Sequence, residues 1–386
     1  MGRVEFVYFD AGGGHRAAAT ALRMVTEQQL HWDVQLMNLQ ELLDSIDPML
    51  KLTGLRLQDL YNWILKNNWT WGAGFGLRVL QAAIRLYHPS QVRLLEECWR
   101  KSRPSLVVSL VPHFNRAIFE SLQRVTPVTP FVTVLTDLAD YPPHFWLERQ
   151  EQFVICGSQR AVAQARATGL REDQICETSG MILHPRFYQG IPTDRAAERR
   201  RLNLDPGLPT GLVMFGGHGS KVMVKIVRRL EATKLNLQLI LICGHNERLA
   251  AELRTMRGEI RKCVVGFTTE VPYYMCLADF FIGKPGPGSI SEALAMKLPV
   301  IVERNAATLP QERFNSDWVM KKQVGLVVRD FGQIAATVEE LLEPTNFARF
   351  RSNAAAVNNR AVFEIPGMLQ EILDQSRSPE VKESKS

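Results

Sequence analysis

The sequence predicts an α/β protein built from two doubly wound parallel sheets. Short β-rich apolar runs alternate with longer helical patterns along its 386 residues, which is typical of βαβ units. A strand, a glycine loop and a helix follow one another twice, at residues 4–29 and again at residues 212–232. At roughly 150 residues per domain, the length also predicts more than one domain.

The remaining strand candidates fall into two groups. Those of the first half are residues 106–110, 131–135 and 153–156, and those of the second half are residues 238–243, 262–265, 280–282 and 300–302. Between the halves, residues 186–209 interrupt the apolar pattern with prolines and a charged run. We therefore predict a first domain over 1–185, a linker over 186–209, a second domain over 210–345, C-terminal helices over 346–375 and a disordered polar tail over 376–386.

Composition excludes several classes of protein. With 46% hydrophobic and 22% charged residues, the chain matches a globular enzyme and not a collagenous, coiled-coil or disordered protein. No window approaches the roughly 18 apolar residues of a membrane span, and no secretory signal precedes the first strand, so we expect a cytoplasmic protein. The net charge of +6 favours an anionic partner: a membrane surface, a nucleic acid or a phosphorylated substrate.

The two glycine loops are candidate anion sites. Ligands of open α/β sheets bind beyond the carboxyl ends of the strands, so two such domains would bring both loops to one cleft. Gly13 and Gly14 in the first loop, and Gly216, Gly217 and Gly219 in the second, would present backbone N–H groups at a helix start. A tight turn uses the same glycines, so both interpretations stay open for each loop alone. Neither loop matches the dinucleotide fingerprint or the P-loop, which argues against hydride transfer and an ATP site.

Polar side chains follow several of the predicted strands. His15 begins a helix, where the dipole disfavours its charged form, and is a candidate general base. Asp137 is a candidate base, orienting group or helix cap. Ser289 and Glu292 have the spacing of a capping box, which by itself favours capping over ligand binding. Gln311 and Glu312 either accept hydrogen bonds from sugar hydroxyls or begin a solvated helix.

Residues 48–95 combine aromatic, leucine and basic side chains. The segment contains Trp63, Trp69, Trp71, Phe75 and Tyr87, with six Lys and Arg against Asp59 alone. This composition suits a lipid-facing interfacial surface; a buried aromatic core with a basic rim is the alternative. We expect no nucleic acid partner, because no known binding module accompanies these residues.

Several motifs occur in the order seen in a known family. They are DAGGGHRAA, VTVLTDL, ICGHNERLA, VVGF, GKPGPGSISEAL followed by LPVIV, and PQERFN. Through them residues 4–375 resemble the monogalactosyldiacylglycerol synthases and their bacterial diacylglycerol glycosyltransferase relatives, and more distantly the MurG-type glycosyltransferases. The resemblance implies the GT-B fold and inverting transfer of a hexose, with galactose or glucose favoured, from a UDP-sugar to a diacylglycerol-type lipid.

The resemblance also assigns roles to individual residues. His15 would deprotonate the acceptor or position the diphosphate, and Asp137 would assist the acceptor. Glu292 would bind the ribose, against the capping interpretation, while Phe267 would lie at the base. The donor site would comprise Gly13, Gly14, Gly216, Gly217, His218, Gly219, Ser220, Phe267, Gly286, Pro287, Gly288, Ser289, Glu292, Gln311 and Glu312.

The same resemblance defines the expected partners and location. They are the nucleotide sugar, the lipid and an anionic membrane surface, with no obligatory metal or other cofactor. The protein would be cytoplasmic and associated peripherally with the inner membrane. Two rival functions are a GT-B UDP-sugar isomerase of the 2-epimerase type, against which the aromatic basic segment argues, and a non-catalytic nucleotide-sugar or lipid sensor, against which His15 argues.

Overall fold

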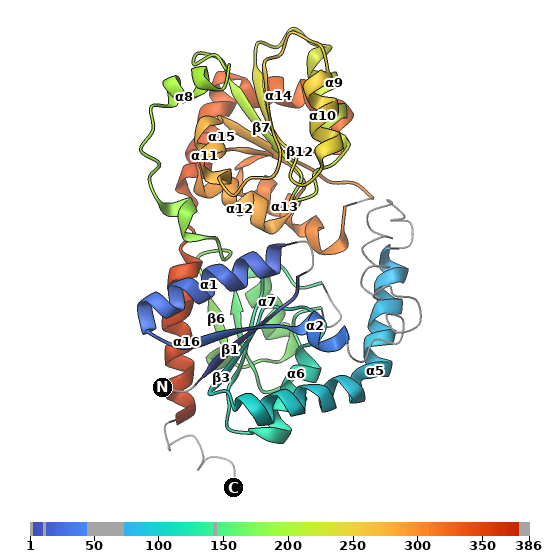
Figure 1. Cartoon of the computed structure of the whole chain (residues 1–386), viewed down its shortest axis with the longest axis vertical. Coiled ribbons are helices and arrows are strands. Elements are labelled where there is room, and N and C mark those ends of the chain that lie inside the picture. Colours follow the sequence, from blue (N-terminus) through green and yellow to red (C-terminus); the bar gives the residue numbers. More distant parts are fainter. Residues whose placement is uncertain (1–2, 11–12, 45–72, 142–144, 307, 378–386) are drawn as a thin grey trace. The chain divides into compact units, whose positions relative to one another are not determined.

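The chain forms two units, each built around a six-stranded parallel sheet (Figure 1). The computed structural model describes residues 3–10, 13–44, 73–141, 145–306 and 308–377. Unit 1 comprises Met1–His184, Leu309–Gln311 and Arg360–Ser386, and unit 2 comprises Pro185–Thr308 and Glu312–Asn359. These two parallel sheets with interleaved helices confirm the predicted fold class.

In unit 1 the strands pair in the order β2-β1-β3-β4-β5-β6. The strands are β1 (Val4–Tyr8), β2 (Val34–Asn38), β3 (Leu106–Ser109), β4 (Phe131–Val134), β5 (Phe153–Cys156) and β6 (Ile175–Glu177). The helices are α1 (Gly14–Leu30), α2 (Leu39–Leu43), α5 (Ala73–Ser102), α6 (Asn115–Val125), α7 (Gln159–Thr168) and α16 (Ala361–Arg377).

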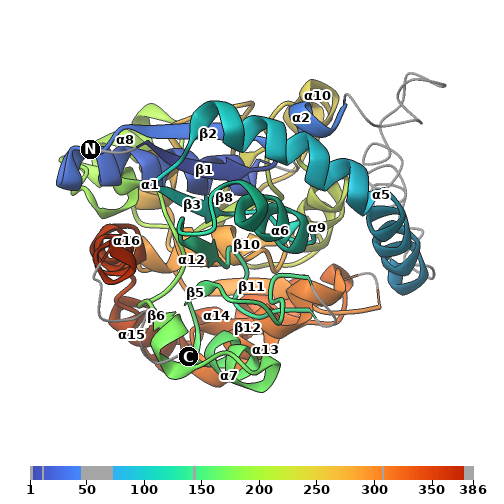
Figure 2. The same ribbon diagram turned by 90° about the horizontal axis from the view of Figure 1, so that it is seen from below.

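The last helix of the chain belongs to unit 1. Figures 1 and 2 show α16 beside α1, the first helix of the chain. Glu364 of α16 accepts hydrogen bonds from the backbone N–H and the hydroxyl of Ser179, at 2.8 and 2.7 Å. The C-terminal segment is thus held on unit 1 by direct polar contacts.

In unit 2 the strands pair in the order β12-β11-β10-β7-β8-β9. The strands are β7 (Thr210–Met214), β8 (Gln238–Ile242), β9 (Lys262–Val265), β10 (Phe280–Gly283), β11 (Val300–Glu303) and β12 (Gly325–Val328). The helices are α8 (Arg195–Arg201), α9 (Val222–Glu231), α10 (Glu247–Thr255), α11 (Val271–Leu277), α12 (Pro287–Ala295), α13 (Arg313–Lys322), α14 (Ile334–Leu342) and α15 (Pro344–Ala356).

Both strand orders contain one point at which the direction of winding reverses. In unit 1 the chain winds outward from β1 through β2 on one side and from β3 onward on the other. In unit 2 the same reversal lies between β7 and β10. Loops that leave such a pair of strands diverge, and the space between them is where open α/β sheets bind ligands.

The units divide the chain differently from the predicted domains. Residues 186–209, expected as a linker, lie within unit 2, and the expected C-terminal helices are shared between the units, with α15 in unit 2 and α16 in unit 1. Helix α16 ends at Arg377, and the rest of the expected tail lies outside the described residues. Residues 48–72 of the aromatic basic segment also lie outside them. Within the described ranges, no helix is long and apolar enough to cross a membrane.

A buried arginine ties residues 186–209 to the unit 2 sheet. Arg199 on α8 is 4% exposed and donates to the carbonyl of Leu277 at 2.8 Å and to Asp279 Oδ2 at 2.7 Å. Asp279 also accepts from Arg195 at 2.7 Å and from the backbone N–H of Thr210 at 2.8 Å. Because Thr210 begins β7 and Asp279 precedes β10, this cluster fixes the amino ends of the two strands between which the winding reverses.

We expect the Arg199→Ala variant to lower the free energy of unfolding by about 3 kcal/mol, because it removes one partner of a buried ion pair and orphans backbone carbonyls. Chemical denaturation followed by circular dichroism measures the loss. Arg201→Ala is the matched control: its ion pair with Glu198 is solvent-exposed, and its loss should cost about 1 kcal/mol or less. Equal effects of the two substitutions would contradict the structural role of Arg199.

Candidate functional site

The first candidate site lies at the carboxyl end of β1 in unit 1. The loop after β1 ends at Gly13, whose φ of +80° is a conformation that favours glycine. Gly14 begins α1, and no side chain caps this helix start. Gly13 and Gly14 therefore meet the requirements of a turn and also leave first-turn N–H groups without a side-chain acceptor.

His15 lies in the first turn of α1 and contacts residues from two other strand ends. Its Nδ1 is 2.9 Å from the hydroxyl of Thr136, which follows β4, and its ring centroid is 5.8 Å from that of Trp146. Burial lowers the pKa of His15 to about 4, although a hydrogen bond with the backbone of Leu110, beyond β3, acts in the opposite direction. The imidazole is therefore neutral near pH 7 and able to accept a proton.

Trp146 lies between Asp137 and His15 and contacts both residues. The Asp137 carboxylate is 8% exposed and accepts a hydrogen bond from Trp146 Nε1 at 2.9 Å. Trp146 is fully buried, and its backbone N–H donates to Asp140 at 2.8 Å. Of the three roles open for Asp137, this arrangement favours an orienting role, because the carboxylate fixes the indole that lies beside the imidazole.

The second candidate site lies at the carboxyl ends of β7 and β8 in unit 2. Gly216 and Gly219 adopt φ values of +75° and +58°, and a Cβ at Gly219 would lie 2.6 Å from the carbonyl oxygen of Cys243. The backbone N–H of His245 donates to the carbonyl of Gly217 at 2.8 Å, and a Cβ at Gly244 would collide with that carbonyl. The glycines therefore allow the two loops to pack backbone against backbone.

This packing engages the carbonyl groups of the β7 loop and leaves several of its N–H groups free. Asn246 donates to the carbonyl of His218 at 3.3 Å. Among the described residues, no acceptor bonds the N–H groups of Gly217, His218 and Ser220. The Ser220 hydroxyl accepts from the N–H of Val222 at 3.3 Å. The free N–H groups precede α9, whose dipole adds positive potential.

Helix α12 follows the loop after β10. Its N-cap lies three residues before Ser289, the residue that a capping box with Glu292 would require as N-cap. Gly286 is the N-cap and Pro287 the first helical residue, and no side chain caps the helix. Ser289 and Glu292 therefore lie inside the helix, and the capping interpretation is wrong. Proline favours the first helical position because its φ is fixed and it has no N–H to satisfy. The N–H groups of Gly288 and Ser289 consequently have no side-chain acceptor.

Glu292 is a half-buried carboxyl group on α12. Burial raises its pKa to about 7. Among the described residues, no hydrogen bond or ion pair reaches its carboxylate. Since a desolvated carboxyl without a partner is costly, this group is suited to accept hydrogen bonds from an external ligand.

Lys284 lies between the loops that follow β7 and β10 and was not among the predicted site residues. Its Nζ is 3.3 Å from Glu312 Oε1. A Cβ at Gly216 would lie 3.9 Å from Lys284 Cε, and a Cβ at Gly286 would lie 3.3 Å from it. Lys284 thus places a positive charge between the helix starts after β7 and β10. Its position directly after β10 in GKPGPGS was the available signal.

Gln311 and Glu312 belong to a single 3₁₀ turn, Pro310–Glu312. Glu312 is 8% exposed, precedes α13 without a capping hydrogen bond from its side chain, and pairs with Lys284, so the solvated-helix interpretation is excluded for this residue. Gln311 is half-buried. Asn315, on the first turn of α13, donates to the carbonyl of Pro285 at 2.7 Å and holds the glycine-rich loop in place.

Phe267 follows β9 and lies further along the same edge of the sheet. It is 58% exposed and stacks on His245, with ring centroids 4.0 Å apart and an interplanar angle of 17°. His218 lies 6.2 Å from His245, measured between ring centroids. The exposed ring is available to stack on a planar ligand. His245 and Thr136 were not assigned as site residues, although both lie in motifs of the family.

The unit 2 site therefore combines free backbone N–H groups, one lysine, an unpartnered carboxyl and an exposed aromatic ring. These are the groups that recognise phosphate, ribose and a base. The unit 1 site offers a neutral imidazole as proton acceptor. Over the described residues, no group of three or more His, Cys, Asp and Glu side chains is placed to hold a metal ion.

Comparison with known proteins agrees with these features. Residues 211–361 match the glycosyltransferase family 28 C-terminal domain. The chain is 29% identical over 392 residues to the chloroplastic monogalactosyldiacylglycerol synthase of Spinacia oleracea, covering 97% of this chain and 73% of the spinach protein.

Solved structures share the fold at low sequence identity. The S. aureus MnaA–UDP co-structure has a TM-score of 0.65 at 14% identity, covering 97% of both chains. MurG of Acinetobacter baumannii has a TM-score of 0.65 at 10% identity, covering 96% of this chain and all of that one. Residues 211–361 thus match a glycosyltransferase family 28 C-terminal domain, in a chain with the GT-B fold that is similar in sequence to the monogalactosyldiacylglycerol synthases over nearly its whole length.

Proposed function

We propose that this glycosyltransferase moves a hexose, galactose or glucose being favoured, from a UDP-sugar to the hydroxyl of a diacylglycerol-type lipid with inversion at the sugar. The observation that carries the proposal is the unpartnered carboxyl of Glu292 on the helix whose uncapped start follows β10. A ribose offers two hydroxyl donors to such a carboxylate, and a diphosphate fits the N–H groups of the helix start. The UDP in the S. aureus MnaA structure and the lipid in the name of the spinach relative support this choice.

The leaving group would be stabilised by fixed positive groups and without an obligatory metal. As the bond between the sugar C1 and the phosphate oxygen breaks, negative charge develops on UDP. The N–H groups of Gly217, His218, Gly288 and Ser289 would face that charge, and Lys284, which also pairs with Glu312, would add a positive charge. Gln311 and Glu312 would hold the sugar hydroxyls, and Phe267 would stack on the base.

The acceptor would be activated by His15. The lipid oxygen attacks C1 as the bond to UDP breaks, the hydroxyl proton passes to the neutral imidazole, and the bonding electrons leave with UDP. Thr136 would hold the ring, and Asp137 would act through Trp146 as a positioning residue. A single displacement of this kind needs one base and no glycosidase-like carboxylate pair.

The direct test is transfer of sugar to lipid vesicles. The purified protein is incubated with diacylglycerol in anionic liposomes and a panel of UDP-sugars, and UDP release and glycolipid are measured together. Glycolipid from one sugar is the expected result. UDP release without glycolipid would reject diacylglycerol as acceptor, conversion of the UDP-sugar without lipid would favour an isomerase, and binding without turnover would favour a sensor.

His15→Ala should reduce transfer at least 100-fold while leaving the affinity for UDP nearly unchanged, because a general base contributes roughly that factor and does not contact the nucleotide in this mechanism. Steady-state transfer and calorimetric titration with UDP measure the two effects. His31→Asn is the matched control, since His31 is an exposed residue that ends α1 in a left-handed conformation that asparagine tolerates. Unchanged turnover in His15→Ala would remove His15 from the mechanism.

We expect the affinity for a UDP-sugar to rise with pH through about 7. Burial raises the pKa of Glu292 to about 7, so the carboxylate that accepts the ribose hydroxyls forms only as the pH passes that value. Below it the affinity should fall by up to about tenfold per pH unit. Titrations with UDP-glucose in the absence of lipid, between pH 5.5 and 8.5, measure the effect.

The matched control for this pH dependence is Glu292→Gln. The amide cannot ionise, so this variant should bind more weakly at high pH and show a flat profile. The same slope in the variant and the wild type would exclude Glu292 as the titrating group.

Lys284→Met should weaken UDP binding about tenfold and leave uridine binding nearly unchanged, because the lost charge would act on the diphosphate, which uridine lacks. Lys225→Met is the matched control: Lys225 is another half-exposed, ion-paired lysine of unit 2, bonded to Asp330 at 2.6 Å on the outer face of α9. Equal losses for UDP and uridine would mean that Lys284 only maintains the structure of the loop.

A further inference from the structure

The basic excess of the chain is concentrated in one segment of unit 2. Residues 221–262 contain ten of the 46 Lys and Arg and four of the 40 Asp and Glu. The remaining 36 basic residues equal the remaining 36 acidic residues, so this segment alone accounts for the net charge of +6. A net charge of +6 on 42 residues gives this segment a positive potential that favours anionic partners.

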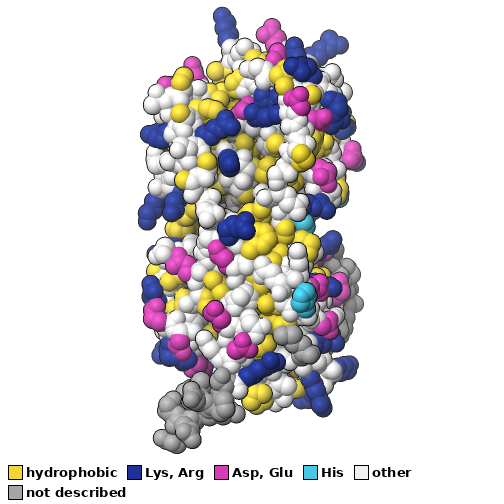
Figure 3. Space-filling view, turned by 90° about the vertical axis from the view of Figure 1, so that its left-hand side faces the viewer, with side chains coloured by type: hydrophobic (Ala, Val, Ile, Leu, Met, Phe, Trp, Pro, Cys, Tyr) yellow, Lys and Arg dark blue, Asp and Glu magenta, His cyan; other side chains and the backbone are white. Residues whose placement is uncertain are grey.

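The segment runs from α9 through β8 and α10 to β9, with the two helices in contact on one side of the sheet (Figure 1). We call the exposed cations of these two helices and their flanking loops the α9–α10 surface; it comprises Lys221, Arg228, Arg229, Lys234, Arg248, Arg254, Arg257 and Arg261. Figure 3 draws the face of the molecule seen from the left-hand side of Figure 1, where basic and acidic side chains are interspersed. The helices α9 and α10 lie on the right-hand side in Figure 1.

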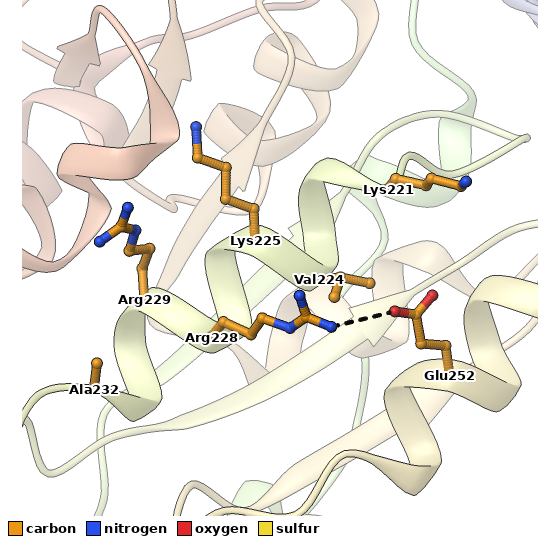
Figure 4. A pocket seen from close by; sticks show the side chains of 7 residues that line it. All are labelled: Lys221, Val224, Lys225, Arg228, Arg229, Ala232 and Glu252. Atoms are coloured by element: carbon orange, nitrogen blue, oxygen red, sulfur yellow. Dashed lines mark ion pairs between the residues drawn. The ribbon is translucent and has the colours of Figure 1, made fainter.

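The α9–α10 surface is hollowed. One hollow of about 590 Å³ is lined by Lys221, Lys225, Arg228 and Arg229 from α9 and its N-cap, with Glu252 of α10 opposite (Figure 4). A second hollow of about 370 Å³ is lined by Arg254, Arg257 and Lys262 among apolar side chains. Since α10 contributes to both, the basic lining extends over more than one site.

Internal ion pairs neutralise only part of this surface. Lys225 bonds Asp330 at 2.6 Å, and Arg228 reaches Glu252 at 3.8 Å, as the dashed line in Figure 4 marks. Within the described part of the chain, Lys221, Arg229 and Arg257 form no ion pair. Their charges are therefore available to an external anion.

We propose that the α9–α10 surface is a membrane-contact surface that takes anionic phospholipid headgroups. A single phosphate would need one hollow, whereas cations spread over two hollows and two helices match many headgroups in one plane. The choice of a membrane over another polyanion rests on the proposed lipid acceptor. The α9–α10 surface belongs to unit 2, whereas the described residues of the aromatic basic segment belong to unit 1.

The position of this surface has a consequence for the donor site. Lys221 follows Ser220 directly, and the N–H of Met223 donates to the carbonyl of Ser220 at 3.0 Å. The basic face of α9 therefore continues from the loop whose free N–H groups would face the diphosphate. Headgroup contact along α9 would hold the donor unit at the leaflet that contains the acceptor.

The experiment measures co-sedimentation of the full chain with phosphatidylcholine vesicles that contain either no phosphatidylglycerol or 30 mol% phosphatidylglycerol, without diacylglycerol or nucleotide. The test variant carries Lys221→Gln, Arg229→Gln and Arg257→Gln. We expect its partition coefficient on the anionic vesicles to fall about 100-fold, since each cation near such a surface contributes roughly a factor of five. Added salt should weaken wild-type binding far more than binding of the variant.

The matched control removes three exposed cations from another part of unit 2, with Lys321→Gln, Lys322→Gln and Arg351→Gln. This control variant should bind vesicles within about twofold of wild type. An equal loss in both variants would overturn the proposal, because net charge and not the α9–α10 surface would then govern binding. Equal wild-type binding to neutral and anionic vesicles would overturn it as well.

Two further measurements distinguish a membrane from other anions and test the proposed function independently. Competition by millimolar inorganic phosphate would overturn the proposal, because the surface would then bind a small anion. Binding to duplex DNA with the same residue dependence, and no binding to vesicles, would overturn it as well. Transfer to detergent-solubilised diacylglycerol should be equal in wild type and test variant. Absence of transfer in both would contradict the proposed function, while the vesicle result stands by itself.

Discussion

Both candidate sites depend on the reversal of strand order within a parallel sheet. Every crossover in such a sheet has the same hand, so the loops that leave the two strands at the reversal must diverge. In unit 2 this exposes the helix starts after β7 and β10, with Lys284 between them. In unit 1 it places His15 against residues that follow β3 and β4. The candidate proton acceptor and the candidate anion-binding groups therefore arise from one topological feature used twice.

Close backbone approach then determines which polar groups of the unit 2 loops remain free. Because Gly219 and Gly244 carry no Cβ, the β8 loop engages the carbonyl groups of Gly217 and His218. The N–H groups of the same residues are left for a ligand. The turn interpretation and the anion-site interpretation of these glycines are therefore compatible, because the tight packing of the turn orients the free N–H groups.

The sequence predicted the central strands well, and the structure shows why the rest escaped prediction. The strands it missed, β2, β6 and β12, are edge strands, which are buried on fewer sides and carry a weaker apolar pattern. The run Asp194–Arg201 reads as solvated charge, yet Arg199 is buried against Leu277 and Asp279, some 80 residues away. Lys284, Thr136 and His245 act through similar contacts between distant loops, which spacing along one motif does not reveal. The capping-box prediction failed for a local reason, because Pro287 begins the helix before Ser289.

Electrostatic interactions of short range and of long range occur in different parts of unit 2. At the proposed donor site the fixed groups are backbone dipoles, one lysine and a desolvated carboxyl, and interactions among partly buried groups are little affected by salt. On the α9–α10 surface the charges are exposed and numerous, so their attraction for an anionic plane is strongly screened. The net charge of +6 gives no hint of this division. The α9–α10 surface and the proposed donor loop adjoin at Ser220 and Lys221. We therefore expect the proposed membrane contact to be more sensitive to salt than the proposed nucleotide binding.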